Sequence, residues 1–229
     1  SDVYKRQVWG GGPHRNDSPK ALGVLPTVRE LLFSGREKEA EKMIADNFFT
    51  GQHGMPFQTI GSLMLEFDGH ADYSDYRREL DLEKAIASVR YKIGEVNYIR
   101  TVFTSLADNA LIVRIEADKP GAVNFTTRYS TPYKEYEIKK NGKSLLLSGH
   151  GSAHEGIPGA IRFETRTQIK AEKGKVNVTS DCIEVKGADA AVIYVTAATN
   201  FVNYKDVSAN ETRRATEFLS QAMKRPYVQ

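Results

Sequence analysis

Cysteine is nearly missing from this sequence, which has one cysteine, Cys182, in 229 residues. A single thiol cannot form a disulfide within the chain, so a small domain stapled by disulfides is excluded. Because no disulfide can form within the chain, cysteine usage does not reveal the compartment in which the chain folds.

Long apolar runs are missing as well. No stretch reaches the roughly 18 consecutive apolar residues that a membrane-spanning helix needs, so we expect no membrane span. An excess of one charge is also missing, because 32 basic residues face 29 acidic ones and leave a net charge of +3. This near balance gives no reason to expect nucleic acid or an anionic membrane as a partner.

The sequence begins with a segment that does not match the residues after it. Residues 1–7, SDVYKRQ, join abruptly to VWGGGP at residues 8–13 and contain no apolar core of a signal peptide. We interpret residues 1–7 as a non-native lead, the alternative being an ordinary first strand. Under this interpretation native sequence begins near Val8, and the missing signal peptide says nothing about secretion.

The familiar catalytic motifs are missing too. The sequence contains no G-x-S-x-G nucleophile elbow, and the glycines at 10–12 lack the GK[ST] or GxGxxG context of a phosphate-binding loop. A packed loop held by Trp9 is the simpler interpretation of these glycines, and a sugar-stacking role for Trp9 is the alternative. A pair of catalytic carboxylates cannot be picked from 29 acidic residues by sequence.

What the sequence does contain is β structure, and residues 76–129 show it best. Apolar and polar residues alternate there in successive runs, which is typical of antiparallel strands. Turn residues separate the runs: Gly94-Glu95 offers a tight reversal, and Pro120-Gly121 fits a type II turn. Further on, Asn141-Gly142 is a strong hairpin signal.

Helical periodicity occurs in two places. We expect a helical insertion at about residues 26–49, opened by Pro26 and lying against the sheets. A second helix is expected to start at a capping box formed by Ser208 and Glu211, with Leu219 on its apolar face, and to end before Pro226. Roughly a dozen strands with these helices predict a mainly β fold, a two-sheet antiparallel β-sandwich.

A glycine-rich loop at residues 149–156 carries two histidines. His150 and His154, with Glu155, raise the possibility of a metal site, but their spacing matches no strong zinc motif and no further ligand set is evident. We therefore expect no metal and no cofactor.

Several stretches resemble the N-terminal domain of glycoside hydrolase family 95, the α-L-fucosidase type. They are VWGGGP at 8–13, MPFQTIGSL at 55–63, YRRELDLEKAIASVRY at 76–91, VFTSLADNALIVRIEADKPGAV at 102–123 and AATNFVNYKDV at 197–207. The resemblance extends from Val8 to Gln229, and YRRELDL with the downstream VFTS is its most specific part. Two loops depart from the family pattern, since Gly10 stands where the family usually has Ser and Ser62 where it has an acid.

The resemblance implies a β-sandwich of the supersandwich type ahead of a helical linker and an (α/α)6 catalytic barrel. It implies an inverting exo-α-L-fucosidase acting on fucosylated glycans, in the periplasm or outside the cell. We accordingly expect residues 8–206 to be the sandwich domain without its first strands, and residues 207–229 to begin the linker towards a barrel that is not in this chain, on which the sandwich packs.

No catalytic residue can be carried onto this chain, because the family's acid and base belong to the barrel. Trp9, His53 and Gln58 are the candidates for a substrate-rim role, since they lie in the two family-like loops and offer a ring face or hydrogen-bonding groups. The alternative is that all three serve loop structure or the domain interface. Two other functions stay open: a stand-alone carbohydrate-binding or scaffolding module, and the N-terminal domain of a family 65-type sugar phosphorylase.

Overall fold

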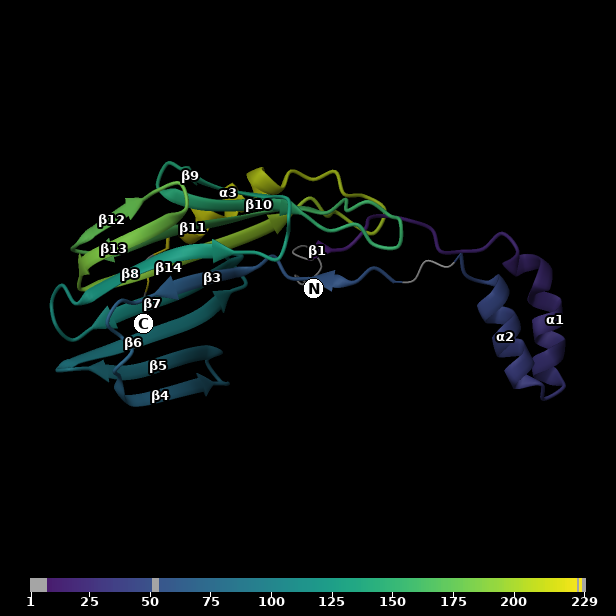
Figure 1. Cartoon of the computed structure of the whole chain (residues 1–229), viewed down its shortest axis with the longest axis horizontal. Coiled ribbons are helices and arrows are strands. Elements are labelled where there is room, and N and C mark those ends of the chain that lie inside the picture. Colours follow the sequence, from purple (N-terminus) through teal and green to yellow (C-terminus); the bar gives the residue numbers. More distant parts are fainter. Residues whose placement is uncertain (1–7, 51–53, 226, 228–229) are drawn as a thin grey trace.

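The computed structural model describes residues 8–50, 54–225 and 227. Two antiparallel β-sheets face each other, and the helices lie outside them (Figure 1). This arrangement confirms the predicted mainly β, two-sheet antiparallel sandwich. None of the described helices is long and apolar enough to cross a membrane.

The larger sheet has eight strands and the smaller sheet has four. In spatial order the larger sheet consists of β4 (Ser74–Asp81), β5 (Ile86–Ile93), β6 (Val96–Ser105), β7 (Ala110–Ala117), β14 (Ala190–Thr199), β11 (Arg162–Glu172), β10 (Ser144–His150) and β9 (Tyr136–Asn141). The smaller sheet consists of β12 (Lys175–Val178), β13 (Cys182–Ala188), β8 (Val123–Ser130) and β3 (Ser62–Glu66). A separate short pair is formed by β1 (Val8–Trp9) and β2 (Phe57–Gln58).

The main core fills the space between the two sheets. Strands alternate apolar and polar residues, so each strand sends one set of side chains inward, as β8 does with Val123 and Phe125. Phe163, Ile115 and Leu147 from the larger sheet are almost completely buried against them. Burying a large apolar side chain of this kind stabilises the fold by about 1.5–3 kcal/mol.

The predicted turns are confirmed. Ile93 pairs with Val96 across a reversal in which Gly94 has a φ of 55°. Gly121 has a φ of 71° in the turn that joins β7 to β8. Gly142 has a φ of 60° in the turn between β9 and β10. Positive φ is what glycine accepts at little cost, so these turns set the register of the strands on either side.

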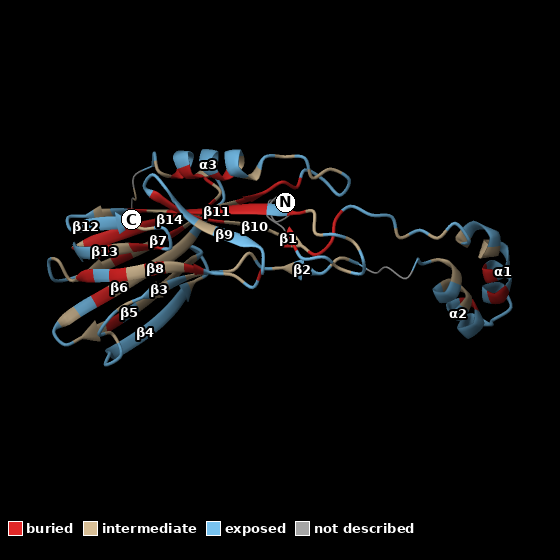
Figure 2. Cartoon of the chain, turned by 45° about the horizontal axis from the view of Figure 1, so that its top comes forward, coloured by how far each residue is buried: buried red, intermediate tan, exposed pale blue. Residues whose placement is uncertain are grey.

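The larger sheet extends past the smaller one. Strand β4 is the outermost strand, and seven of its eight residues are exposed, including Leu80 (Figure 2). At the facing edge strand β3, the inward-pointing Leu63 and Leu65 are only half-buried. The inner face of the β4–β5 region therefore has less cover than the rest of the sandwich.

The C-terminal helix α3 (Glu211–Ala222) packs on the outer face of the larger sheet. Leu219 and Ala222 are buried in a second cluster with Ile112 and Tyr194, and Met223 packs against its edge. The apolar face predicted for this helix thus finds its partner within the chain.

The start of α3 differs from the predicted capping box. Asn210, not Ser208, is the N-cap, since its side-chain oxygen accepts a hydrogen bond from the backbone N–H of Arg213 at 2.7 Å. Glu211 is then the first helical residue rather than the third. The backbone N–H of Ser208 donates instead to the Asp206 carboxylate at 2.8 Å, which keeps Ser208 in the preceding turn.

We expect Asn210→Ala to lower the free energy of unfolding by about 1 kcal/mol, because it leaves the Arg213 amide without its acceptor. Urea unfolding followed by circular dichroism measures the change. Ser208→Ala is the control and should change the same free energy by less than about 0.5 kcal/mol. Equal losses for the two variants would contradict Asn210 as the cap.

Helices α1 (Ala21–Phe33) and α2 (Glu37–Asn47) form a hairpin that we call the helical arm. The prediction that these helices lie against the sheets is wrong, because the arm projects from one end of the sandwich and packs on itself (Figures 1 and 2). The predicted start is also wrong: α1 begins at Ala21, and Pro26 lies inside it. Pro26 is exposed on this helix, and as a proline it has no backbone N–H to donate to the preceding turn.

Candidate functional site

Four loops meet at the end of the sandwich from which the helical arm projects. They comprise residues 10–13, 54–56, 151–161 and 200–209, and we call this region the loop end. Backbone hydrogen bonds join the first three: Gly10 N–H donates to Pro56 at 3.0 Å, Gly11 N–H donates to Ser152 at 2.8 Å, and Ala160 N–H donates to Gly11 at 2.9 Å. The loop end is therefore built largely by main-chain pairing.

This pairing explains the run of glycines at the start of the loop. Gly11 has a φ of 66°, and a Cβ there would lie 2.4 Å from the Met55 sulfur. At Gly12 a Cβ would lie 2.6 Å from the Ala160 Cβ. The glycines allow close approach of neighbouring loops, which agrees with the packed-loop interpretation of this segment.

Trp9 connects the loop end to the core. Its ring packs edge-on against Phe201 with 4.9 Å between ring centroids, and it lies against the main core. The residue is half-buried, and its indole Nε1 is buried without a hydrogen-bond partner in the described structure. The structure places Trp9 where it can hold the loop, and stacking on a sugar stays a prediction.

Gln58 lies beside the same loops. Its side-chain Oε1 accepts a hydrogen bond from the Ser152 backbone N–H at 3.2 Å, and the Tyr133 hydroxyl lies 3.5 Å away. Trp9 and Gln58 lie in one region, because β1 and β2 pair at Trp9–Phe57 and Val8–Gln58. The third predicted rim residue, His53, lies outside the described residues.

Asn200 joins the remaining loop to the others, and sequence reasoning missed it. It is fully buried, and its side chain makes three hydrogen bonds. Oδ1 accepts from the Arg162 backbone N–H at 2.9 Å, while Nδ2 donates to the carbonyls of Ala160 at 2.9 Å and Val207 at 2.8 Å. One amide thus fixes the ends of two loops.

An open groove of about 900 Å³ lies at the loop end, beside the connection to the helical arm. Its lining residues are Pro13, His14, Arg15, Asn16, Asp17, Tyr204 and Lys205. The ring of Tyr204 is 70% exposed, with the Lys205 ammonium 5.2 Å from its centroid. Arg15 and Asp17 form a two-pronged ion pair at 2.7 and 2.5 Å. A ring with charged and amide groups beside it suits a polyhydroxylated ligand.

The two histidines of the 149–156 loop pair with separate acids. His150 Nε2 lies 2.7 Å from the Glu135 carboxylate, whereas His154 Nε2 lies 3.9 Å from Glu155. Across residues 8–50, 54–225 and 227, no three His, Cys, Asp or Glu side chains gather as a metal-ligand set. The pairing with Glu135 raises the pKa of His150, and a hydrogen bond to the Gly151 carbonyl adds to it.

A second cluster of titratable groups lies between the sheets, near the far end of β3. The ring of His70 packs on Phe67 and Tyr98, and its Nδ1 lies 2.9 Å from the Tyr91 hydroxyl. Arg100 donates to the same hydroxyl at 2.5 Å and covers the Phe67 ring at 3.8 Å. Burial lowers the pKa of His70 below its ordinary 6.5, and the Arg100 charge lowers it further.

His70 and His150 are expected to have opposite effects on how stability depends on pH. Because the pKa of His70 is lowered in the folded state, His70 takes up a proton near pH 6.5 in the unfolded chain but only at lower pH in the folded chain. The stability that neutral His70 contributes is therefore present above pH 6.5 and falls as the pH falls towards the lowered pKa. Stability from His150 is present below pH 6.5 and is lost as the pH rises through its raised pKa. We expect His70→Phe to flatten the acid side of a plot of melting temperature against pH, and His150→Gln to flatten the other side. Identical profiles for both variants and the parent would contradict these assignments.

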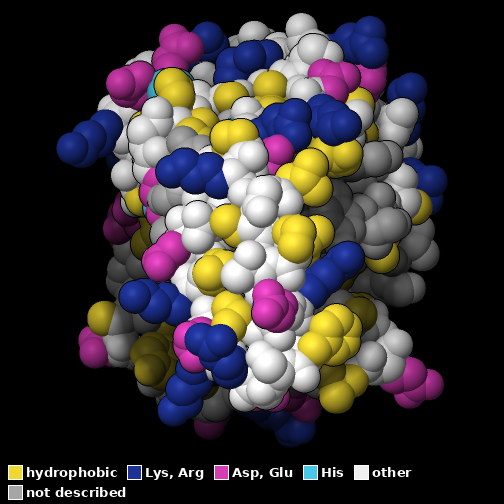
Figure 3. Space-filling view, turned by 90° about the vertical axis from the view of Figure 1, so that its right-hand side faces the viewer, with side chains coloured by type: hydrophobic (Ala, Val, Ile, Leu, Met, Phe, Trp, Pro, Cys, Tyr) yellow, Lys and Arg dark blue, Asp and Glu magenta, His cyan; other side chains and the backbone are white. Residues whose placement is uncertain are grey.

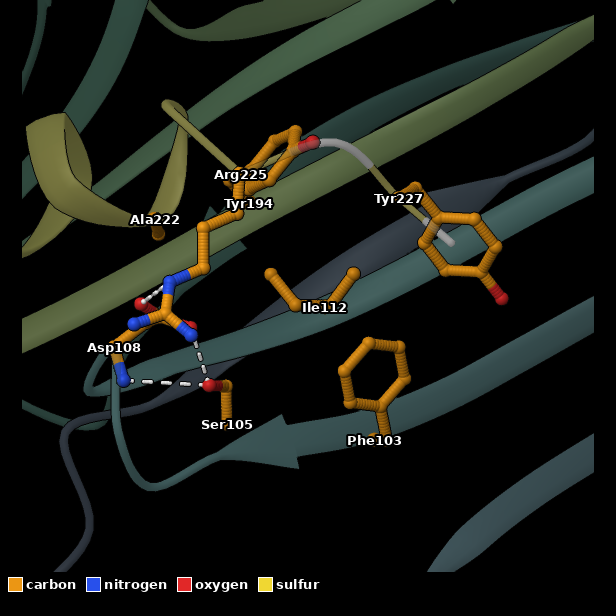
Figure 4. Close-up of a pocket in the computed structure, with 8 residues that line it drawn as sticks. All are labelled: Phe103, Ser105, Asp108, Ile112, Tyr194, Ala222, Arg225 and Tyr227. Carbon is orange, nitrogen blue, oxygen red and sulfur yellow. Dashed lines mark hydrogen bonds and ion pairs between the residues drawn. The ribbon is translucent and has the colours of Figure 1, made fainter. Parts of the chain in front are cut away.

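A smaller pocket of about 210 Å³ lies under the end of α3 (Figure 4). Most of its wall is apolar, including Phe103 and Ile112, and Asp108 lies at one side. The Asp108 carboxylate accepts from Ser105 at 2.6 Å and pairs with Arg225 at 2.9 Å. Its charge is therefore neutralised by groups of the chain, and no second acid is among the lining residues.

Comparisons with known proteins show what this fold is similar to. A family model described as "Glycosyl hydrolase family 65, N-terminal domain" matches residues 4–204. Alpha-L-fucosidase 2 of Arabidopsis thaliana is 30% identical over 225 residues, which cover 87% of this chain and 26% of that protein. A protein of Aspergillus niger assigned as alpha-fucosidase A is 26% identical over 215 residues, which cover 89% of this chain and 26% of that protein.

Among solved structures, a human-microbiome protein assigned as a kojibiose phosphorylase has the same fold. The TM-score is 0.51 at 11% sequence identity, and the match covers 75% of this chain and 26% of that one. The chain thus spans about a quarter of the length of the curated relatives it matches.

Proposed function

Since this chain belongs to the family of glycosyl hydrolase family 65 N-terminal domains, we propose that it is the non-catalytic N-terminal β-sandwich domain of an inverting exo-α-L-fucosidase. The activity resides in a catalytic barrel outside this chain and releases terminal α-L-fucose from glycans. One observation carries the fucosidase assignment over a phosphorylase. The two relatives named as α-fucosidases match nearly the whole chain at 30% and 26% identity, against 11% for the kojibiose phosphorylase structure.

The proposed domain covers residues 8–206, and residues 207–229 begin a helical linker. The half-buried Leu63 and Leu65 at the edge of the smaller sheet support the further proposal that this domain contains additional strands outside the described residues. Such strands would extend the smaller sheet from β3 and cover the inner face of the β4–β5 region. The proposed lead at residues 1–7 lies outside the described residues.

The loop end is the part of the domain proposed to face the catalytic barrel. Trp9 and Gln58 hold its loops together, and the groove at Tyr204 and Arg15 offers a ring and charged groups next to them. A role of this region at the rim of the substrate pocket would bring Trp9, Gln58 and the groove close to the glycan. His53 keeps the same proposed role, although it lies outside the described residues.

The test compares two proteins on an aryl α-L-fucoside. The longer polypeptide encoded by the gene should release the aryl group at a rate independent of phosphate, and this chain alone should release none. Release that requires phosphate would favour the phosphorylase alternative. Fucose release by the purified chain would contradict a non-catalytic domain. A gene that stops shortly after Gln229, with glycan binding by this chain in calorimetry, would favour a stand-alone binding module.

A further inference from the structure

The helical arm has more apolar surface than its two helices can bury. Its own core consists of the buried Val28, Leu31 and Ala40, with Met43 and Ile44 packed beside them. An isolated helix of this length is marginal in water, and most helical stability in proteins comes from packing an apolar face. Three buried residues make a small core for two helices that stand clear of both sheets.

Helix α1 carries a second apolar stripe that α2 does not cover. Leu22 is 80% exposed, Leu32 is 48% exposed and Phe33 is 91% exposed. At 3.6 residues per turn, Leu22 and Phe33 are about three turns apart and share one side of the helix, on which the exposed Arg29 lies between them. Leu32 lies about a quarter turn round from Phe33. In Figure 3, with the arm nearest the viewer, hydrophobic side chains lie open among charged ones. Such a stripe on a helix is the pattern by which a helix docks into an apolar groove.

The uncovered stripe differs from the outer face of α2. The exposed positions of α2 are mostly charged and of both signs, including Lys38, Glu41 and Lys42. A solvated face of this kind needs no partner. The two helices of the arm therefore differ in chemistry, with α2 facing water and α1 offering an apolar surface.

The place of the arm in the molecule indicates what covers α1. The arm leaves the sandwich at the loop end, between the groove residues 13–17 and the β2 segment. The proposed function puts the catalytic barrel on that side. The curated relatives that match this chain are about four times its length, since the match covers 26% of each. Those relatives therefore contain about three times as much further polypeptide as this chain, enough to supply a partner surface for α1.

We propose that the apolar stripe of α1, formed by Leu22, Leu32 and Phe33, docks against the catalytic part of the longer polypeptide, into a groove between its helices. This inference rests on the proposed function. The arm then acts as a clamp that fixes the loop end on the catalytic part, and the charged face of α2 stays in solvent. Two helices packed at the usual 8–10 Å axis separation would bury the stripe.

Hydrogen exchange tests the docking directly. Amides of residues 21–33 should exchange at least about tenfold more slowly in the longer polypeptide than in this chain alone, because docking suppresses local opening. Leu32→Glu combined with Phe33→Glu should abolish that difference. In this chain alone the same double variant should leave the melting temperature within about 2 °C, because both side chains are exposed.

Lys38→Glu combined with Lys42→Glu is the matched control on α2 and should leave the slow exchange of α1 intact. Equal exchange of α1 in the two proteins would overturn the docking. Protection that already appears in this chain alone and grows with its concentration would also overturn it, because a second copy would then cover the stripe. Hydrogen exchange does not depend on catalytic activity, so it separates the docking from the proposed function. If α1 is protected in a longer protein that does not release fucose, docking is supported and the fucosidase assignment is contradicted. If α1 is unprotected in a longer protein that does release fucose, only the docking is contradicted.

Discussion

Glu164→Ala is expected to lower the free energy of unfolding by about 3–5 kcal/mol, because it leaves a buried positive charge without its partner. The Glu164 carboxylate lies 2.5 Å from Arg166 Nε, and the two side chains are 6% and 9% exposed. The second carboxylate oxygen accepts a hydrogen bond from the Thr212 hydroxyl of α3 at 2.8 Å. The ion pair therefore also holds the C-terminal helix on the larger sheet.

A matched exposed pair separates burial from charge. Lys139 and Glu137 are likewise two residues apart on a strand and lie 2.6 Å from each other, but their side chains are 48% and 59% exposed. Glu137→Ala should cost less than about 1 kcal/mol, since solvent screens the pair. Urea unfolding of both variants provides the comparison.

Replacing both buried partners tests the cause of the loss. Glu164→Leu combined with Arg166→Met leaves no unpaired buried charge. Replacing a buried ion pair by apolar side chains often leaves the free energy of unfolding unchanged or raises it. The double variant should therefore regain most of the stability that Glu164→Ala loses. A double variant as unstable as Glu164→Ala would show that packing at α3, and not the unpaired charge, causes the loss.

The strands and turns that could be predicted are those that local chemistry determines. Gly94 and Gly142 adopt positive φ in tight turns, and alternation fixes which side of the strand is buried. Strand β4 lies at the start of the 76–129 stretch, and alternation marks no buried side there, because seven of its eight residues are exposed. It is a strand because its backbone pairs with β5, and sequence periodicity does not report that pairing.

Predictions that depended on tertiary packing were less successful. Helical periodicity located the arm, yet it could not show whether Val28 and Leu31 face a sheet or another helix, and they face α2. At α3, Ser208 and Asn210 are both good cap residues, and the hydrogen bond from Ser208 to Asp206 decides between them.

The residues of the candidate site also divide into those that a local sequence pattern could select and those that only the tertiary structure brings together. Trp9 and Gln58 could be selected because they lie in loops that resemble a known family, and the structure brings them to one region. The groove residues Arg15 and Tyr204 come from distant segments, so no local pattern joins them. Asn200 lies within the family-like stretch AATNFVNYKDV, and that stretch was the one signal that could have pointed to it.

Asn200→Ala is expected to lower the free energy of unfolding by about 3 kcal/mol, since it removes a fully buried side chain and leaves one backbone N–H and two carbonyls without their partner, at roughly 1 kcal/mol each for groups that are only partly buried. Those groups belong to Arg162, Ala160 and Val207, so the variant should also loosen the loop end. Faster hydrogen exchange at residues 158–162 and 200–209 would report this loosening, and urea unfolding would report the stability.

Two further variants show whether the three hydrogen bonds cause the effect. Asn203→Ala, in the same loop, removes an exposed side chain that accepts one hydrogen bond from the Lys205 amide at 2.9 Å, and it should cost less than about 1 kcal/mol. Asn200→Asp keeps the acceptor for Arg162 and loses both donors, and it buries a carboxylate facing two carbonyls. It should therefore be no more stable than Asn200→Ala despite its matching shape. An Asp variant close to the parent in stability would show that side-chain shape, and not donation to Ala160 and Val207, holds the loop end together.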